Sequence, residues 1–158
     1  MTDVYVIAVG NEKEGYYRQA IDEYAKRISA YARVTVREIK EKRLPEDPSA
    51  REIERALEEE GKEIIAALPK NCVLCALCVE GKELSSPEFA AFIENAAQKG
   101  PLAFVIGSSH GLAQSVKNAA SCRISFSRMT FPHRLMRVIL FEQIYRGLSM
   151  INNGKYHK

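Results

Sequence analysis

AFVIGSSHG, residues 103–111, joins a short apolar run to a loop rich in glycine and serine. The run Ala103–Ile106 is short and rich in bulky apolar side chains, which is typical of a buried strand. Gly107 ends the run, and a short helix is expected from Ala113 to Ala120. A strand that leads through a glycine loop into a helix predicts an α/β protein.

The rest of the chain repeats this alternation of strand and helix. Four further strands are predicted at residues 4–9, 34–39, 72–79 and 123–126, and four further helices at residues 16–28, 50–68, 86–98 and 134–151. Ser49 and Glu52 have the spacing of a capping box at the start of one helix. Because most of the strands are apolar throughout, both faces of the sheet are expected to be covered. The chain is predicted to be one α/β domain, residues 1–158, with a mostly parallel sheet and helices on both faces.

The composition indicates a water-soluble globular protein. Of the 158 residues, 46% are hydrophobic and 27% are charged, which is ordinary for this class. No apolar run approaches the roughly 18 residues that a membrane helix needs. The N-terminus lacks the basic segment of a secretory signal. A cytoplasmic location without a membrane partner is therefore expected.

The three cysteines of residues 72–78 have the C-x2-C-x2-C spacing that begins some iron–sulfur motifs. Such a motif would continue with a cysteine where this chain has Lys82. The residues between the cysteines are apolar, and successive side chains of a strand point to opposite faces. Cys72 and Cys78 would face one side and Cys75 the other. The cysteines, Cys122 included, are therefore predicted to fill the core, and no metal site is expected.

Positive charge gathers in the last part of the chain. Residues 123–158 contain seven basic side chains and one acidic one, so this segment carries +6 and the first 122 residues carry −3. A basic segment on a mildly acidic body is a plausible footprint for an anionic partner such as RNA. A solvated basic helix face explains the same composition, and the sequence leaves both interpretations open.

Ligands of parallel sheets bind beyond the C-terminal ends of the strands. Three such ends stand out, at residues 77–82, 106–111 and 125–133. The second can offer backbone amides to a ligand, and the third combines apolar and hydroxyl side chains that suit an adenine ring. The pattern G-x-S-x-G at residues 107–111 is also found in serine hydrolases. Glu142 is the only acidic residue that follows it, which argues against a catalytic triad.

Five motifs occur in order along the chain: Ile7–Gly10, Leu77–Lys82, Val105–Gly107 with Gly111, Ser127–His133 and Tyr156–Lys158. Together they resemble the ribosomal large-subunit methyltransferase H family, in the SPOUT class of knotted methyltransferases. The resemblance spans essentially all 158 residues.

The resemblance implies a trefoil knot near the C-terminus, a homodimer, and S-adenosylmethionine bound in the knot. It implies methylation of ring nitrogen 3 of a pseudouridine in the intersubunit stem-loop of 23S ribosomal RNA. Because a single small domain offers few phosphate contacts, the assembled ribosome is the expected platform. The family's cofactor contacts fall on Leu77, Gly107, Phe126, Ser127, Arg128, Met129, Thr130 and Phe131. One departure is Ser108, which stands where the family usually has a second glycine. Serine fits there unless the position requires a positive φ.

The resemblance also implies that the tail reaches the cofactor of the partner subunit. His157 is then the expected base or proton relay, with Tyr156 packing nearby and Arg137 or Lys158 favouring the imide anion. Basic side chains of the last helix and the tail are expected to contact RNA phosphates: Arg134, Arg137, Arg146, Lys155 and Lys158. The alternative is a non-catalytic RNA-binding module that uses the basic C-terminal third and binds no S-adenosylmethionine.

Overall fold

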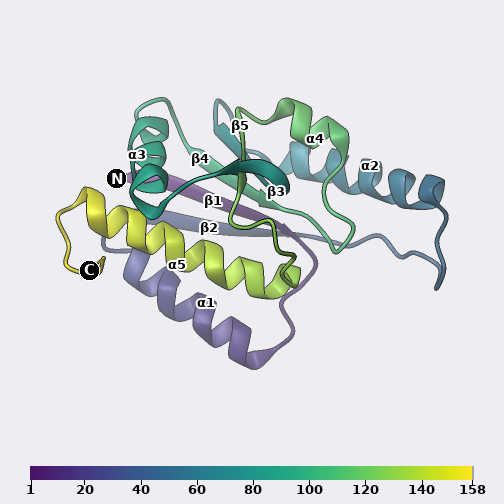
Figure 1. Cartoon of the computed structure of the whole chain (residues 1–158), viewed down its shortest axis with the longest axis horizontal. Coiled ribbons are helices and arrows are strands. Elements are labelled where there is room, and N and C mark those ends of the chain that lie inside the picture. The colour runs from purple at the N-terminus through teal and green to yellow at the C-terminus, as the bar shows by residue number, and fades with distance from the viewer. Residues whose placement is uncertain (158) are drawn as a thin grey trace.

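Five parallel strands form the centre of the molecule, and helices cover both faces of the sheet (Figure 1). The computed structural model describes residues 1–157, and Lys158 lies outside the described residues. The strands are β1 (Thr2–Val9), β2 (Ala32–Ile39), β3 (Val73–Glu83), β4 (Leu102–Ile106) and β5 (Cys122–Ser125), in the spatial order β2-β1-β4-β3-β5. The helices are α1 (Gly15–Ile28), α2 (Ala50–Ala67), α3 (Ser86–Ala97), α4 (Gln114–Ala119) and α5 (His133–Ile151). The predicted α/β class, the parallel sheet and the helices on both faces are confirmed.

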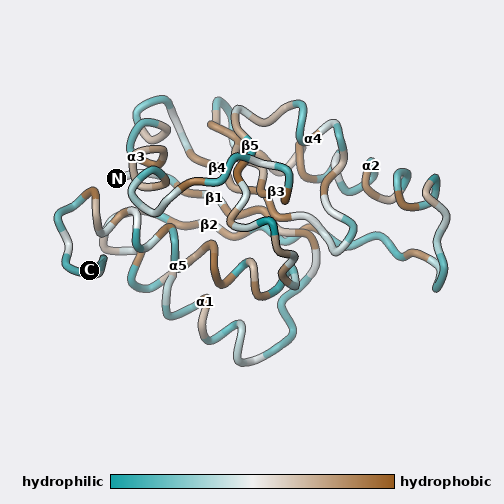
Figure 2. Tube along the Cα trace, in the orientation of Figure 1, coloured by the Kyte–Doolittle hydropathy of each residue, from teal (hydrophilic) through white to brown (hydrophobic). Residues whose placement is uncertain are grey.

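The sheet separates two hydrophobic cores. On one face, α1, α3 and α5 pack over side chains such as Val6 and Phe104; on the other, α2 and α4 pack over side chains such as Ile7 and Val105. Neighbouring residues of β1 and β4 thus point to opposite faces, as the pleat of a strand requires. Figure 2 shows hydrophobic residues along the central strands and a hydrophilic loop between β2 and α2. The two-sided burial explains why most of these strands are apolar throughout.

Local sequence signals fix the start of α2. The hydroxyl of Ser49 accepts a hydrogen bond from the Glu52 amide at 3.1 Å, and the Glu52 carboxylate accepts one from the Ser49 amide at 3.2 Å. This is the predicted capping box. Gly61 lies in the middle of the same helix, where a β-carbon would come within 2.9 Å of the Ala113 side chain. The glycine therefore lets α2 approach the segment before α4 closely.

The prediction for β3 is wrong at its C-terminal end. The predicted strand ended at Val79, whereas β3 continues to Glu83. The register between β3 and β5 shifts between Leu77 and Lys82, which marks a bulge. At Gly81, a β-carbon would lie 2.6 Å from the backbone carbonyl carbon of Ile124. Only glycine therefore allows the extended β3 to touch β5 here.

Cys72, just before β3, and Cys75 lie on opposite faces of the sheet as predicted, whereas Cys78 belongs to neither hydrophobic core, which the prediction did not anticipate. Cys75 is fully buried on the α1, α3 and α5 face, while Cys72 packs against the opposite core. Within residues 1–157, no three His, Cys, Asp or Glu side chains are grouped so that they could hold a metal ion. Among the helices of these residues, none has the length and apolarity needed to span a bilayer.

The last helix links the two ends of the sheet. It begins at His133, beside the C-terminal ends of the strands, and runs back across the sheet to Ile151 (Figure 1). Nineteen helical residues span about 28 Å. The C-terminal tail therefore lies at the opposite end of the molecule from the C-terminal ends of the strands.

Candidate active site

A cavity of about 740 Å³ lies at the C-terminal ends of β3, β4 and β5. Its volume is in the range of sites for small organic ligands. Three segments form most of the wall, Leu77–Glu80, Ile106–Leu112 and Ile124–His133, with Lys117 and Met136 completing it; Arg128 is the one residue of the third segment outside the wall. These are the three strand ends that the sequence singled out, so the structure brings them together as predicted.

The loop between β4 and α4 is a tight turn. The Gly111 amide donates a hydrogen bond to the Ser108 carbonyl at 2.9 Å, and the Ser108 hydroxyl accepts one from the His110 amide at 3.3 Å. A β-carbon on Gly107 would overlap the Gly111 carbonyl group, so position 107 requires glycine. Positive φ falls on Gly111, at 92°, and not on Ser108. Serine therefore fits at position 108 without backbone strain.

The loop between β5 and α5 forms the other side of the cavity. Phe126 packs edge-on against Phe89 of α3, with 5.8 Å between ring centroids. The Ser127 hydroxyl accepts a hydrogen bond from the Met129 amide at 3.0 Å, and the Ser127 carbonyl accepts one from the Ser125 hydroxyl at 2.9 Å. These bonds hold the turn that follows β5. Phe126 thus anchors the loop in the core, while Met129 remains 73% exposed at the mouth.

Seven of the eight residues that the resemblance assigns to the cofactor line this one cavity: Leu77, Gly107, Phe126, Ser127, Met129, Thr130 and Phe131. Arg128 does not. Its side chain is 92% exposed and lies 3.7 Å from the Glu83 carboxylate at the end of β3. The Arg128 side chain therefore points away from the cavity, and only its backbone lies near the wall.

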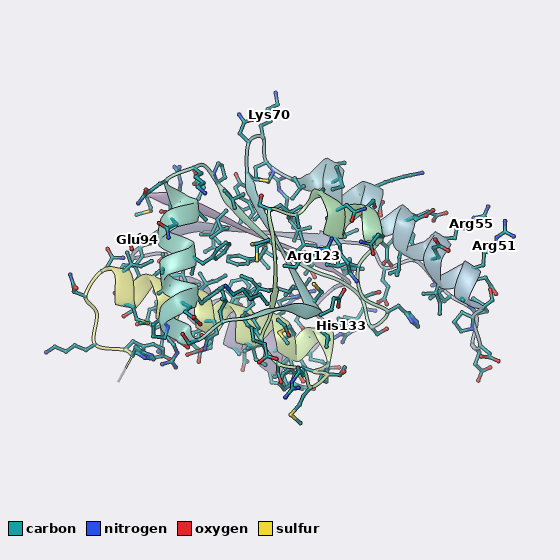
Figure 3. The ribbon with its side chains drawn as sticks, turned by 45° about the horizontal axis from the view of Figure 1, so that its top comes forward. Arg51, Arg55, Lys70, Glu94, Arg123 and His133 are labelled. Carbon is teal, nitrogen blue, oxygen red and sulfur yellow. The ribbon has the colours of Figure 1, made fainter. Side chains whose placement is uncertain are left out.

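His133 also lines the cavity, although the sequence analysis gave it no role. It is the first residue of α5 and is half-buried (Figure 3). Burial lowers the pKa of His133 below 6.5, and the nearby carboxylate of Glu41 opposes this effect. The signal in the sequence was its place directly after Pro132, at the junction of the loop after β5 with the last helix. Further wall residues without a predicted role include Ser108, His110, Lys117 and Met136.

Arg137 lies in the interior, and the prediction that it contacts RNA phosphates at the surface is wrong. Its side chain is 3% exposed. One guanidinium nitrogen donates to the Glu38 carboxylate at 3.1 Å and another to the Gly10 carbonyl at 2.9 Å. These partners come from the ends of β2 and β1. The spacing of basic residues on the last helix could not reveal that Arg137 would meet them. Arg137 is absent from the cavity wall.

Tyr156 and His157 pack against the far end of α5. The Tyr156 ring lies 4.6 Å from the ring of Tyr145, with the Arg146 guanidinium 4.8 Å from its centroid. Nδ1 of His157 lies 3.2 Å from an Arg146 nitrogen. Burial raises the pKa of Tyr156 to about 12, so its phenol stays protonated at neutral pH. The structure does not bring either residue to the cavity of its own chain.

Acidic residues neutralise much of the basic C-terminal segment. Arg134 lies 3.9 Å from Glu14, and Arg146 donates to Glu142 at 2.9 Å. Lys155 is exposed, and Lys158 lies outside the described residues. Glu142 belongs to the segment itself. Three acids of the first 122 residues balance part of the charge of the segment: Glu14 beside Arg134, Glu38 beside Arg137 and Glu83 beside Arg128.

The sequence and the fold both match known proteins. Residues 2–157 match the family model described as "Predicted SPOUT methyltransferase". The chain is 44% identical over 158 residues to the "Ribosomal RNA large subunit methyltransferase H" of Carboxydothermus hydrogenoformans, and 42% identical to the proteins of that name from Listeria monocytogenes and Clostridioides difficile. In each case the alignment covers 99% of both chains.

A solved structure has the same fold. It is that of a probable methylase family protein from Haemophilus influenzae, with a TM-score of 0.56 and 12% sequence identity, covering 99% of this chain and 71% of that one. The full-length family match and the identity to several relatives lead to one conclusion. The chain belongs to the SPOUT methyltransferase family, in the methyltransferase H group.

Proposed function

We propose that the protein transfers the methyl group of S-adenosylmethionine to ring nitrogen 3 of a pseudouridine in the intersubunit stem-loop of 23S ribosomal RNA. The observation that carries the proposal is the cavity at the ends of β3, β4 and β5, where seven motif residues of the resemblance share one wall. The names of the full-length relatives, which describe ribosomal RNA large subunit methyltransferases, support the RNA substrate. We take residues 1–158 as one methyltransferase domain.

The shape and chemistry of the cavity fit this cofactor. Leu77, Ile106 and Phe126 supply an apolar surface for an adenine ring, and the backbone after β5 offers hydrogen-bonding groups. The turn at Gly107 brings backbone so close that a single β-carbon would fill the space. When bound, the cofactor supplies a methyl group on a positively charged sulfur. The apolar wall would exclude water, which favours a reaction in which opposite charges disappear.

We also propose that the chain is knotted around this site. In this arrangement the segment from β5 to α5 passes through a loop of the preceding chain, as in other members of the class. The contact of Gly81 with the backbone of Ile124 supports the proposal, because it holds the extended β3 directly against the segment that would be threaded. Both of these segments contribute to the cavity wall.

The position of the tail supports a homodimer. Tyr156 and His157 lie beyond the far end of α5, about 28 Å of helix from the cavity wall at His133. In a twofold dimer, the tail of one subunit would act at the cavity of the other. There His157 would serve as base or proton relay, with Tyr156 packing beside it. Lys158, or Arg137 acting through its field from the interior, would favour the imide anion.

Arg134, Arg146, Lys155 and Lys158 remain our proposed contacts to RNA phosphates. Because a single small domain offers few such contacts, we propose that the assembled ribosome provides the binding platform, in the cytoplasm. A steep fall of affinity with rising salt concentration is expected from phosphate contacts.

Methyl transfer to ribosomes tests this function. Ribosomes that lack the modification would be incubated with the protein and S-adenosylmethionine carrying a tritiated methyl group. The expected result is label in 23S ribosomal RNA, recovered as 3-methylpseudouridine after digestion to nucleosides. RNA binding without S-adenosylmethionine binding or methyl transfer would contradict the proposal and favour the non-catalytic RNA-binding module.

A further inference from the structure

His133 occupies a distinctive place on the cavity wall, at the point where α5 begins. Figure 3 shows it near the middle of the molecule, whereas Arg51 and Arg55 project from the outer end of α2. A β-carbon on Gly10 would lie 3.8 Å from His133 Nε2 and 3.7 Å from a carboxylate oxygen of Glu41. The imidazole and this carboxylate therefore flank the same glycine, at the end of β1.

Charges of both signs face the imidazole. The carboxylates of Glu41 and Glu12 raise its pKa, and the cations Arg134 and Arg137 lower it. Burial has the largest effect and also lowers the pKa, so the imidazole is neutral at pH 7. A neutral imidazole has one nitrogen free to accept a proton.

Arg137 lies one helical turn after His133 and anchors this end of α5. The two residues are four apart on α5 and therefore share a face of the helix. The hydrogen bonds from Arg137 to the Gly10 carbonyl and to Glu38 tie the start of α5 to the ends of β1 and β2. Glu38 in turn accepts a hydrogen bond from the Glu12 amide at 2.9 Å, which holds the turn after β1. These bonds anchor the start of α5, and His133 lines the cavity from this anchored end of the helix.

We propose that His133 is a catalytic residue that accepts the proton of the imide nitrogen as this nitrogen is methylated, with Arg137 as its positioning residue. The inference rests on the proposed function. The imide N–H bond breaks, its proton goes to the imidazole, and its electron pair forms the new bond from nitrogen to the methyl carbon. The bond from the methyl carbon to sulfur breaks, and its electron pair stays on sulfur. The imidazolium, attracted by Glu41, then releases its proton to solvent.

The assignment distinguishes His133 from His157; His110, on the loop after β4, also lines the cavity. His133 belongs to the cavity wall, at the end of α5 that Arg137 anchors, whereas His157 lies on the exposed tail beside Arg146. In this scheme His133 is the first proton acceptor, and His157 serves only as a proton relay.

Titration of the imidazole tests the assignment without any cofactor. In the free protein, the ring resonances of His133 followed by NMR are expected to titrate with a midpoint below 6.5. In the Glu41→Gln variant the midpoint is expected to fall further, because the carboxylate that raises the pKa is gone. A midpoint at or above 6.5 in the wild-type protein, or no response to Glu41→Gln, would contradict the proposed environment.

Kinetics of His133→Ala provide the second test. Methyl transfer is expected to fall by about 100-fold or more, while calorimetric affinity for S-adenosylmethionine changes by less than about threefold. The remaining rate should rise with pH beyond the wild-type plateau, and added imidazole should restore part of it. His157→Ala serves as the matched histidine variant and should show no such rescue.

The outcomes separate the two proposals. If the wild-type protein transfers no methyl group to ribosomes, the proposed function itself fails. If the wild-type enzyme is active and His133→Ala keeps the wild-type rate and pH profile, only the role of His133 is overturned. Loss of activity in a folded His133→Ala protein without imidazole rescue, and with an unchanged pH profile, would likewise overturn it.

Discussion

At the scale of single residues, Gly107 shows how closely the chain approaches itself at the site. A β-carbon there would overlap the carbonyl group of Gly111. Gly107→Ala is therefore expected to displace the loop and lower the affinity for S-adenosylmethionine by about tenfold or more, which corresponds to about 1.4 kcal/mol. Gly15→Ala is the matched control, because nothing lies within 4 Å of a β-carbon there. If calorimetry gives the same affinity for S-adenosylmethionine in Gly107→Ala and in the wild-type protein, the proposed role of this loop in cofactor binding is contradicted.

Glu60 gives a prediction for the pH dependence of stability. Its side chain is buried in α2 and accepts a hydrogen bond from the Lys42 amide at 2.9 Å, and burial raises its pKa above 4.5. A carboxyl whose pKa is raised on folding favours the folded state while protonated, and this stability is lost as pH rises through the folded pKa. Glu60→Gln keeps a hydrogen-bond acceptor without the charge. The melting temperature of the variant minus that of the wild-type protein should therefore increase as the pH rises from 4 to 7. A difference independent of pH would contradict this account.

Sequence reasoning located most of the candidate site but misjudged individual arginines. The resemblance assigned eight residues to the cofactor, and seven of them line the cavity. They fall at strand ends that a parallel sheet brings together, which is where ligands of such sheets bind. The exposure of Arg128 and the burial of Arg137 depend on Glu83 and Glu38, which belong to distant strands. Composition and spacing within the C-terminal segment cannot reveal such partners. The role proposed for His133 likewise emerged only when Gly10 and Glu41 were seen beside it.

At the scale of elements, helix caps and apolar runs predicted nearly all helices and strands to within one or two residues. The exception is β3, whose end depends on the bulge against β5. A bulge of this kind is set by the partner strand, and the order β2-β1-β4-β3-β5 cannot be read from local patterns. The identity of the elements was therefore predictable, and their lateral order was not.

The capping box of α2 carries the prediction at this scale. Ser49→Ala removes the hydroxyl that accepts from the Glu52 amide and is expected to lower the free energy of unfolding by about 1 kcal/mol. Ser49→Asp retains an acceptor and serves as the control, with a change of a few tenths of a kcal/mol at most. Chemical denaturation measures both variants. Equal destabilisation by alanine and aspartate would show that the cap does not hold α2.

At the scale of the whole molecule, the direction of α5 separates the cavity from the tail. A protein truncated before Tyr156 is expected to lose methyl transfer and to keep its affinity for S-adenosylmethionine, because Tyr156 and His157 pack against the far end of α5 and against Tyr24 of α1 in their own chain, away from the cavity. If the proposed dimer forms, mixing truncated subunits with Gly107→Ala subunits should restore activity, since a mixed dimer would have one intact cavity facing one intact tail. Full activity of the truncated protein would refute the role of the tail.

The central claim is that the cavity at the ends of β3, β4 and β5 binds the methyl donor, and calorimetric titration with S-adenosylmethionine tests it most directly. The account predicts saturable binding of one molecule per chain, weakened by Gly107→Ala and unchanged by Arg128→Ala, whose side chain lies outside the cavity wall. A wild-type protein that binds no S-adenosylmethionine, or a Gly107→Ala variant that binds it with wild-type affinity, would contradict the claim.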